Sequence, residues 1–197
     1  GSNLDQDIKP IDLLFLDLID MGNNISEVGH KGILFIMDFV SYFCWAFPIC
    51  SKDSGELAIL LFSLFLAIGV PRYIYCDNEI TINSSTFEKL YKFFGITLFN
   101  SIPYVSRSNG LIENSIGIFK NVLKKIVHTN GDLKNWDFYI DLALCSMNSR
   151  ILSIGLSPFE LLFNRKLNIC NDENAKNLDL KNILQNEKSN IISWWSK

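Results

Sequence analysis

The sequence predicts a mixed α/β domain, and three observations support this fold class. Strand-like apolar runs come first, helix-like and strand-like segments then alternate, and helical segments fill the remainder. Hydrophobic residues make up 48% of the 197 residues and charged residues 20%, a balance typical of a chain that buries a core. After Arg165 the composition changes to Asn, Lys, Asp and Glu. We therefore expect one domain over residues 3–166 and a C-terminal extension over residues 167–197, with a surface helix at Leu178–Glu187.

The first part of the chain is expected to form the centre of a sheet. Leu13–Asp20 is a strongly apolar run with acidic residues set into it, which predicts a buried strand that carries a polar residue at its end. Gly32–Phe39 and Tyr42–Ile49 are rich in β-forming residues and are separated by a short break at Val40-Ser41. These two runs therefore predict a hairpin.

The most apolar stretch of the sequence, Leu57–Val70, is expected to lie in a buried core helix. Ser54 would cap this helix, which runs to about Ala67 and is ended by Gly69 and Pro71. The stretch is too short to cross a bilayer and lacks the features of a signal peptide. We therefore expect no membrane partner.

Shorter strands and several helices follow. Two more strands are expected at Arg72–Cys76 and Ile96–Phe99, and a loop at Asn100–Asn109, which is polar and contains Pro103. Further along, apolar residues recur with helical spacing, and Ser157-Pro158 is a typical helix start. The expected helices run from Ser84 or Ser85 to Phe94, from Gly110 to about His128, from Trp136 to Asn148, and from Phe159 to Phe163.

The cysteines and histidines give no sign of a disulfide framework or a zinc site. The five cysteines are odd in number, scattered and never spaced as CxxC, so we expect buried thiols in a reducing compartment. His30 and His128 have no ligand-spaced partners and are expected at the surface.

The charge of the chain is mildly unfavourable for a nucleic-acid partner. The net charge is −3, whereas neutralising phosphates requires Lys and Arg. Local charge matters more than the total, and Lys120, Lys124 and Lys125 cluster in the middle of the chain.

Three acidic residues stand where a strand ends or a helix begins. Asp17 lies on the first apolar run, Asp77 follows the short run RYIYC, and Glu113 opens the long helical segment in the middle of the chain. Carboxylates at such places are costly unless they are paired or bound to a cation. Three carboxylates without His or Cys suit Mg²⁺ or Mn²⁺ rather than zinc. Taken alone, the three acids are better explained as solvated surface groups, because isolated acids at strand ends are usually solvated.

Five sequence words and one spacing resemble a known family. The words are LDLIDM (Leu16–Met21), GILFIMDFVSYFCWAFPICSKDS (Gly32–Ser54), CDNE (Cys76–Glu79), PYVSRSNGLIEN (Pro103–Asn114) and SPFELLFNRK (Ser157–Lys166). Thirty-five residues separate Asp77 from Glu113. This spacing and these words resemble the DDE integrases of retroviruses and gypsy-type retrotransposons, and LDLIDM is especially similar to Maverick/Polinton integrases. The resemblance covers roughly Leu13–Lys166.

The resemblance implies a fold and a catalytic site. It implies an RNase H-like fold, with a five-stranded mixed sheet flanked by helices. Asp17, Asp77 and Glu113 would be the catalytic residues and the ligands of two Mg²⁺ or Mn²⁺ ions. The family word places the first ligand at Asp17 rather than at Asp20, three residues later. Glu79 stands where the family usually has Gly.

The resemblance also implies where DNA would bind. Lys120 and Lys124 lie seven and eleven positions after Glu113 and so share its helix face. Retroviral integrases have DNA-gripping lysines four and seven positions after the glutamate; Lys120 matches the second, but Gly117 stands at the first. A solvated helix face is the alternative reading of these lysines. The other candidates are Asn109 and Gly110, which match the family's turn before the glutamate, and Tyr104 and Asn114.

The implied function is metal-dependent DNA integration. Water would first cut the 3′ end of the element DNA, and the freed 3′-hydroxyl would then attack a target phosphodiester. Such a core would act in the nucleus on element ends and target DNA. Integrase cores commonly form dimers or higher oligomers, and we expect the apolar surface of the later helices to serve this purpose.

Two other functions remain open at this point. A domesticated, catalytically inactive domain could serve as a DNA-binding or protein-interaction scaffold. The acidic isoelectric point of 5.4, Gly117 and Glu79 favour this reading, whereas the retention of all three acids does not. An RNase H-type or resolvase nuclease would share the metal ions but leaves the SPFELLF segment unexplained.

Overall fold

A five-stranded mixed sheet forms the centre of the molecule, as predicted. The computed structural model describes residues 7–76, 85–99 and 106–168. The strand order is β3-β2-β1-β4-β5; β1, β2 and β3 are antiparallel neighbours, and β4 and β5 run parallel to β1. The strands are β1 (Leu13–Asp20), β2 (Gly32–Asp38), β3 (Cys44–Ile49), β4 (Tyr73–Cys76) and β5 (Thr97–Phe99).

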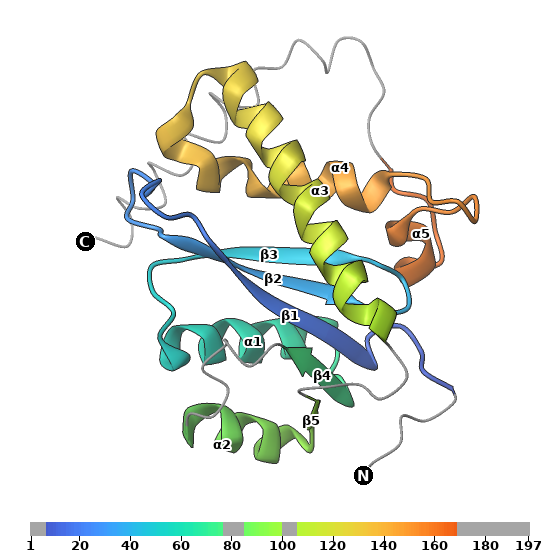
Figure 1. The fold of residues 1–197 in the computed structure, drawn as a ribbon. Coiled ribbons are helices and arrows are strands. Elements are labelled where there is room, and N and C mark those ends of the chain that lie inside the picture. Colours follow the sequence, from blue (N-terminus) through green and yellow to red (C-terminus); the bar gives the residue numbers. More distant parts are fainter. Residues whose placement is uncertain (1–6, 77–84, 100–105, 169–197) are drawn as a thin grey trace. The chain divides into compact units, whose positions relative to one another are not determined.

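Helices cover both faces of this sheet (Figure 1). Helices α1 and α2 pack on one face, and α3 and α4 lie on the other (Figure 1). Their bounds are α1 (Ser54–Ile68), α2 (Ser85–Phe94), α3 (Ser106–Asn130), the 3-10 helix η1 (Leu133–Tyr139), α4 (Ile140–Ser149) and α5 (Pro158–Phe163).

Strand alternation divides the core into two layers. Side chains on a strand point alternately to opposite faces, so Phe15 and Ile19 of β1 pack under α3, whereas Leu14 and Leu16 pack against α1 and α2. The ring of Phe119 on α3 lies 5.3 Å from the ring of Phe35 on β2. The central strands are therefore apolar on both faces, which explains their continuous hydrophobic sequence.

Helix α1 is the predicted core helix, with one correction at its start. The N-cap is Asp53 rather than Ser54, because the Asp53 backbone is extended and its carboxylate accepts a hydrogen bond of 2.9 Å from the Gly55 N–H. No helix in the described part of the chain is long and apolar enough to cross a membrane. The helix buries one face and leaves other large apolar residues exposed, namely Ile59, Phe62 and Leu66.

Two helix starts also differ from the sequence-based expectation. Helix α3 begins at Ser106, so part of the expected loop 100–109 is helical, and residues 100–105 lie outside the described residues. The expected helix from Trp136 begins instead as η1, with Asn135 in a non-helical conformation, before α4 starts at Ile140. Apolar periodicity locates a buried face, but it does not distinguish these terminal conformations.

The last described helix, α5, begins as the sequence indicates. Ser157 is the N-cap: its hydroxyl accepts from the Glu160 N–H at 3.2 Å, and the Glu160 carboxylate accepts from the Ser157 N–H at 2.9 Å. This reciprocal pair is a capping box, and Pro158 occupies the first helical position. Internal contacts divide the chain into Gly1–Lys166 and Leu167–Lys197, and the expected helix at 178–187 lies outside the described residues.

The prediction of buried thiols holds for only half of the described cysteines. Cys44 and Cys76 are buried in strands, where alternation turns their side chains inward. Cys50 and Cys145 are exposed, because one follows the end of β3 and the other lies on the outer side of α4. All four are free thiols, and burial raises the pKa of Cys44 to about 12.

Candidate catalytic and nucleic-acid site

Asp17 is the candidate acid that the sheet places beneath α3. It lies between Phe15 and Ile19 in the alternation of β1 and pairs with Phe35 of β2, so its side chain points to the face that α3 covers. Asp17 is half-buried, and its Oδ1 accepts a hydrogen bond of 2.7 Å from the Leu18 N–H. Asp17 is thus a carboxylate at a half-buried position within a predominantly apolar strand.

Asp20, the competing acid, has a different environment. It is the exposed last residue of β1, and its carboxylate forms an ion pair of 3.0 Å with Lys52. It also accepts a hydrogen bond of 2.7 Å from the Gly22 N–H. The Gly22 hydrogen bond and then Lys52 hold the pKa of Asp20 below its usual value. Asp20 therefore contacts Lys52 and Gly22 at the end of β1, whereas Asp17 lies within the strand.

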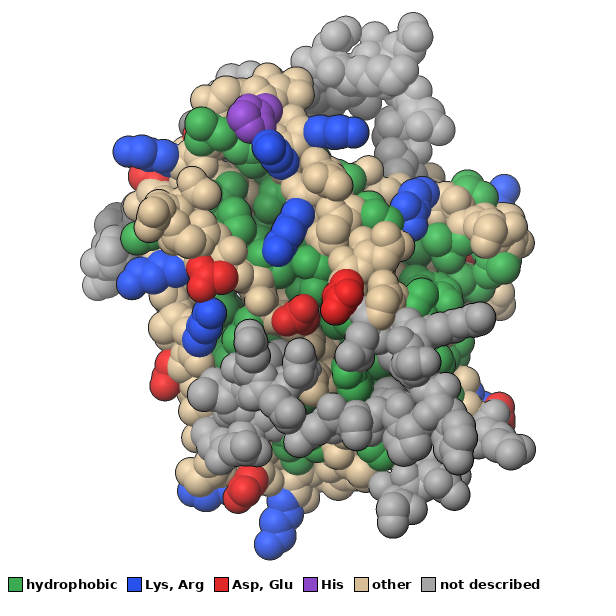
Figure 2. Space-filling model, viewed as in Figure 1, with side chains coloured by type: hydrophobic (Ala, Val, Ile, Leu, Met, Phe, Trp, Pro, Cys, Tyr) green, Lys and Arg blue, Asp and Glu red, His purple; other side chains and the backbone are tan. Residues whose placement is uncertain are grey.

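Glu113 is exposed on α3, between two residues that anchor the helix. Ile112 and Ile116 are buried in the core layer that also contains Phe15 and Ile19 of β1. Figure 2 shows acidic side chains gathered beside the N-terminal half of α3, where this helix passes over β1. The elements that carry Asp17 and Glu113 are therefore packed on each other.

The third acid, Asp77, lies outside the described residues. The backbone just before it is placed: β4 ends at Cys76, which pairs in parallel with Leu16, the residue before Asp17. Within the described residues no group of three or more His, Cys, Asp or Glu side chains is close enough to hold a metal ion.

The structure describes some of the residues that were predicted to contact DNA. Lys120 and Lys124 are exposed on α3, and Asn114 is exposed beside Glu113. Tyr104 and the side chain of Asn109 are outside the described residues. Gly110 does not form the expected turn before the glutamate; it is in the first part of α3, and a Cβ there would meet nothing within 4 Å. An Asn-Gly pair is a typical turn signal, so the sequence predicted a turn at Asn109-Gly110. The structure shows that the backbone there is helical.

Gly117 stands at the position where the sequence resemblance implied a DNA-gripping lysine, and packing does not explain the glycine. A Cβ built at Gly117 would meet nothing within 4 Å. The position therefore has room for a side chain.

A pocket beside α3 was not anticipated from the sequence. This α3 pocket is a cavity of about 550 Å³ between α3, the end of β1, the loop that follows it, and η1. Figure 2 shows apolar side chains in a hollow next to α3, with Lys and His side chains along the helix. Its lining residues are Ile19, Asp20, Met21, Asn24, Ile33, Phe119, Lys120, Leu123, Lys124, Val127, His128, Leu133 and Trp136.

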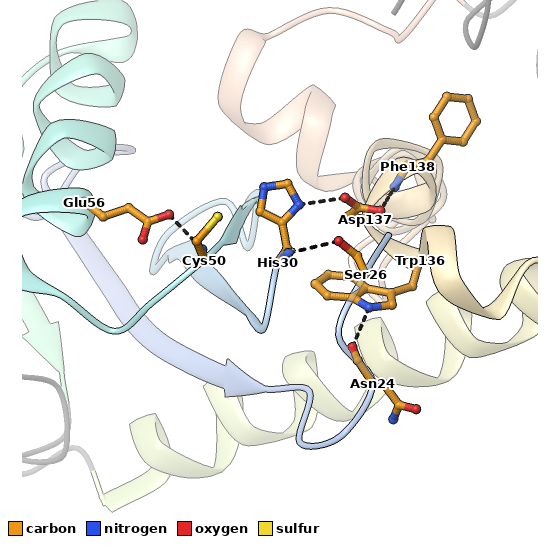
Figure 3. A network of polar contacts seen from close by, with 8 residues as sticks. All are labelled: Asn24, Ser26, His30, Cys50, Glu56, Trp136, Asp137 and Phe138. Atoms are coloured by element: carbon orange, nitrogen blue, oxygen red, sulfur yellow. Dashed lines mark hydrogen bonds and ion pairs between the residues drawn. The ribbon is translucent and has the colours of Figure 1, made fainter. Parts of the chain in front are cut away.

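His30 also differs from its prediction as a surface residue. It is half-buried, and its Nδ1 lies 2.6 Å from Oδ2 of Asp137 on η1, as drawn in Figure 3. The two residues are 107 positions apart in the sequence, so no local spacing could indicate this pair. His128 is exposed, as expected.

Comparison with known proteins gives homologues and a fold. No protein-family model matches the chain. It is 29% identical over 156 residues to the Pro-Pol polyprotein of simian foamy virus type 3 (strain LK3), covering 79% of this chain and 13% of that protein. It is 29% identical over 136 residues to the Gag-Pol polyprotein of baboon endogenous virus (strain M7), covering 68% of this chain and 8% of that protein. The chain thus corresponds to a small part of these relatives.

Solved structures show the fold of this chain. The HTLV-2 integrase catalytic core domain in complex with magnesium matches with a TM-score of 0.65 and 19% identity, covering 80% of this chain and 99% of that one. A simian T-cell lymphotropic virus intasome in complex with the PP2A regulatory subunit B56 gamma matches with a TM-score of 0.69 and 22% identity, covering 86% of this chain and 60% of that one. The chain has the RNase H-like fold of integrase catalytic cores, and its homologues are retroviral Pol polyproteins.

Proposed function

We propose that this chain is an integrase catalytic core that performs 3′-end processing and DNA strand transfer with divalent metal ions. The observation that carries the proposal is the position of Asp17, which is half-buried in an apolar strand and faces the helix that bears Glu113. The parallel pairing of Leu16 with Cys76 supports a place for Asp77 in the same site. The relatives named above are retroviral, so a gypsy-type or Maverick/Polinton origin stays a prediction.

Asp17, Asp77 and Glu113 are the residues that would hold the metal ions. Carboxylate oxygens suit Mg²⁺ and Mn²⁺, and Asp17 provides such oxygens from a half-buried position on β1. Two ions bound there would supply charge stabilisation for the attacking and leaving oxygens of a phosphodiester. Strand β1 would hold Asp17 rigidly, because its neighbours Phe15 and Ile19 are fully buried.

The exposed lysines of α3 would hold the DNA backbone. Lys120 and Lys124 continue the helix face of Glu113, about 10 and 16 Å further along the axis at 1.5 Å per residue. If one phosphate of a DNA strand lies at Glu113, the following phosphates along α3 would therefore meet the side chains of Lys120 and Lys124. Asn109, Gly110, Tyr104 and Asn114 would make lesser contacts around the glutamate.

A second copy of the chain is the proposed protein partner. Helices α1 and α2 present exposed apolar residues, and the ring of Phe62 lies 6.5 Å from that of the exposed Phe93 and 5.5 Å from that of the half-buried Phe94. Exposed apolar patches of this kind commonly mark interfaces. This face lies on early helices rather than on the later ones that the sequence suggested. We propose a homodimer that acts on nuclear DNA.

A catalytically inactive scaffold is the alternative function, and Gly117 favours it. The site accommodates a side chain, yet the DNA-gripping lysine of the related integrases is absent. A scaffold of this kind would bind DNA or a protein regardless of metal ions.

A strand-transfer assay tests the proposed function. Short DNA duplexes and a branched disintegration substrate would be incubated with Mn²⁺ and either the wild-type chain or Asp77→Asn. We expect nicked and joined products with the wild type, and none with the variant. Absence of product with the wild type, together with absence of Mn²⁺ binding by calorimetry, would favour the scaffold instead.

A further inference from the structure

We infer that the α3 pocket binds an unpaired nucleotide of the DNA strand, with the base in the cavity and its phosphate on the lysines of α3. This inference rests on the proposed function, since it assumes that DNA runs along α3. It assigns a ligand to a cavity that the metal site does not use. The cavity volume of about 550 Å³ is within the range typical of small-molecule sites, roughly 300–1,000 Å³.

The floor of the pocket is suited to a flat apolar ring. Ile33, Phe119 and Trp136 are buried at its base, and Leu133 forms a rim with its side chain 61% exposed. The indole N–H of Trp136 donates to the Asn24 carbonyl at 2.8 Å, so this ring contributes no unpaired donor to the pocket lining. Nucleobases that leave a duplex are commonly held by stacking and apolar contact in this way.

The rim of the pocket adds positive charge on the α3 side. The charged residues on this side are Lys120 and Lys124. The acid at the opposite edge, Asp20, is paired with Lys52 at 3.0 Å and so presents little net negative charge. An occupant with an apolar ring and an anionic group directed at α3 therefore fits better than a neutral or cationic one.

The wall opposite α3 is fixed in place by long-range polar contacts. Besides the Trp136 bond, the Glu27 N–H donates to the Lys134 carbonyl at 2.8 Å, and His30 contacts Asp137 at 2.6 Å. Figure 3 shows two of these contacts, Trp136 with Asn24 and His30 with Asp137, which join the β1–β2 loop to η1. The loop is thus anchored to η1 at three points, so the pocket exists before any ligand binds and little ordering cost would accompany occupancy.

The first test compares a base with an abasic site of the same charge. A duplex with a short single-stranded end would be titrated in EDTA, with binding measured by fluorescence anisotropy. We expect the intact end to bind about tenfold more tightly than the same end with abasic residues, because stacking of a base contributes to affinity while the phosphates are unchanged. Equal affinity for the two ends would overturn the inference.

Two matched pairs of exposed residues locate the effect. Leu133→Glu should abolish the tenfold preference for the intact end, whereas Val28→Glu, an exposed apolar residue outside the lining, should retain it. Lys124→Glu should weaken binding about tenfold more than Lys125→Glu, its exposed neighbour outside the lining. Equal effects within both pairs would indicate diffuse electrostatic binding and overturn the inference.

Cross-linking and a free nucleotide complete the test. A strand that carries 5-iodo-deoxyuridine at its unpaired end should cross-link to peptides within residues 19–24 or 119–136, and cross-links only elsewhere would overturn the inference. Deoxyadenosine monophosphate should compete only at far higher concentration than the strand; equal competition would assign the pocket to a free nucleotide. Because binding is measured in EDTA, its failure is separable from failure of strand transfer in Mn²⁺.

Discussion

At the scale of single residues, two acids three positions apart on β1 have different surroundings. Asp17 points under α3 from the interior of the strand, whereas Asp20 is exposed at the strand end and paired with Lys52. Substituting each residue in turn should therefore show whether Asp17 or Asp20 is the metal ligand.

Asp17→Asn should abolish strand transfer, and Asp20→Asn should not. We expect Asp17→Asn to reduce the rate by more than about 100-fold, since losses of 10–100-fold are already typical for groups outside the ligand shell. Asp20→Asn removes only an exposed ion pair, and its rate should stay within about threefold of the wild type. The rates would be measured on the disintegration substrate in Mn²⁺. A reversed order would make Asp20 the first ligand.

Asp38 is a buried carboxylate that holds a turn. Its two oxygens accept hydrogen bonds from the Ile11 N–H at 2.7 Å and from the Ser41 N–H and hydroxyl at 2.7 and 2.6 Å. Ile11 has a φ of 77°, a conformation that is unfavourable for a β-branched residue, and the bond to Asp38 helps to hold it there. Burial raises the pKa of Asp38 above its ordinary value of 3.8, despite these hydrogen bonds.

The raised pKa of Asp38 predicts a pH dependence of stability. Because the folded state binds this proton more tightly than the unfolded state does, the contribution of Asp38 is fully present below pH 3.8 and declines as the pH rises through the folded-state pKa. The free energy of unfolding of the wild type, relative to Asp38→Asn, should therefore fall as the pH is raised from the ordinary value. Urea unfolding of both proteins across this range measures the difference. A difference that increases with pH would contradict the assignment.

At the scale of elements, the helix starts show where neighbouring residues in the sequence determine the position at which a helix begins. The start of α5 is specified by neighbours in sequence: Ser157, Pro158 and Glu160 form a complete capping box. The starts of α3 and η1 have no such signature, and the sequence misplaced both.

Ser157→Ala should destabilise the domain through the loss of this cap. Removal of an N-cap hydroxyl typically costs about 1 kcal/mol. The exposed Ser153, in the preceding loop, provides the matched control, and Ser153→Ala should change stability by less than about 0.5 kcal/mol. Urea unfolding monitored by circular dichroism would measure both. Equal changes would mean that the capping box does not contribute to stability.

At the scale of the whole molecule, the outer face of α1 is unusually apolar. Ile59 is 69% exposed and Leu66 is 64% exposed, on a helix whose opposite side is buried in the core, and Phe93 of α2 is 74% exposed. These residues would be covered in the proposed homodimer.

Substitution on this face should convert the proposed dimer to a monomer. Ile59→Lys introduces a charge into this face and should shift the molecular mass, measured by size-exclusion chromatography with light scattering, toward that of one chain. Val28→Lys places the same charge on a residue that is 61% exposed in the β1–β2 loop, and it should leave the mass unchanged. A dimer that survives Ile59→Lys would place the interface elsewhere.

The order and type of the sheet elements could be predicted from the sequence because they follow from local patterning. Apolar runs bounded by turn residues located β1 to its exact bounds, and they located β2 and β3 to within two residues. The same runs suggested which acids lie on strands and helices. The candidate site could be predicted only through the resemblance of its words to integrases, because three separate acids carry no local signal.

Only the tertiary structure decided which of these residues meet. Strand alternation and the packing of α3 over β1 turn Asp17, and not Asp20, toward the helix of Glu113. The α3 pocket and the contact between His30 and Asp137 join segments about a hundred residues apart. The physical reason is that periodicity encodes the direction of a side chain within its own element, whereas the partner it meets depends on how distant elements pack.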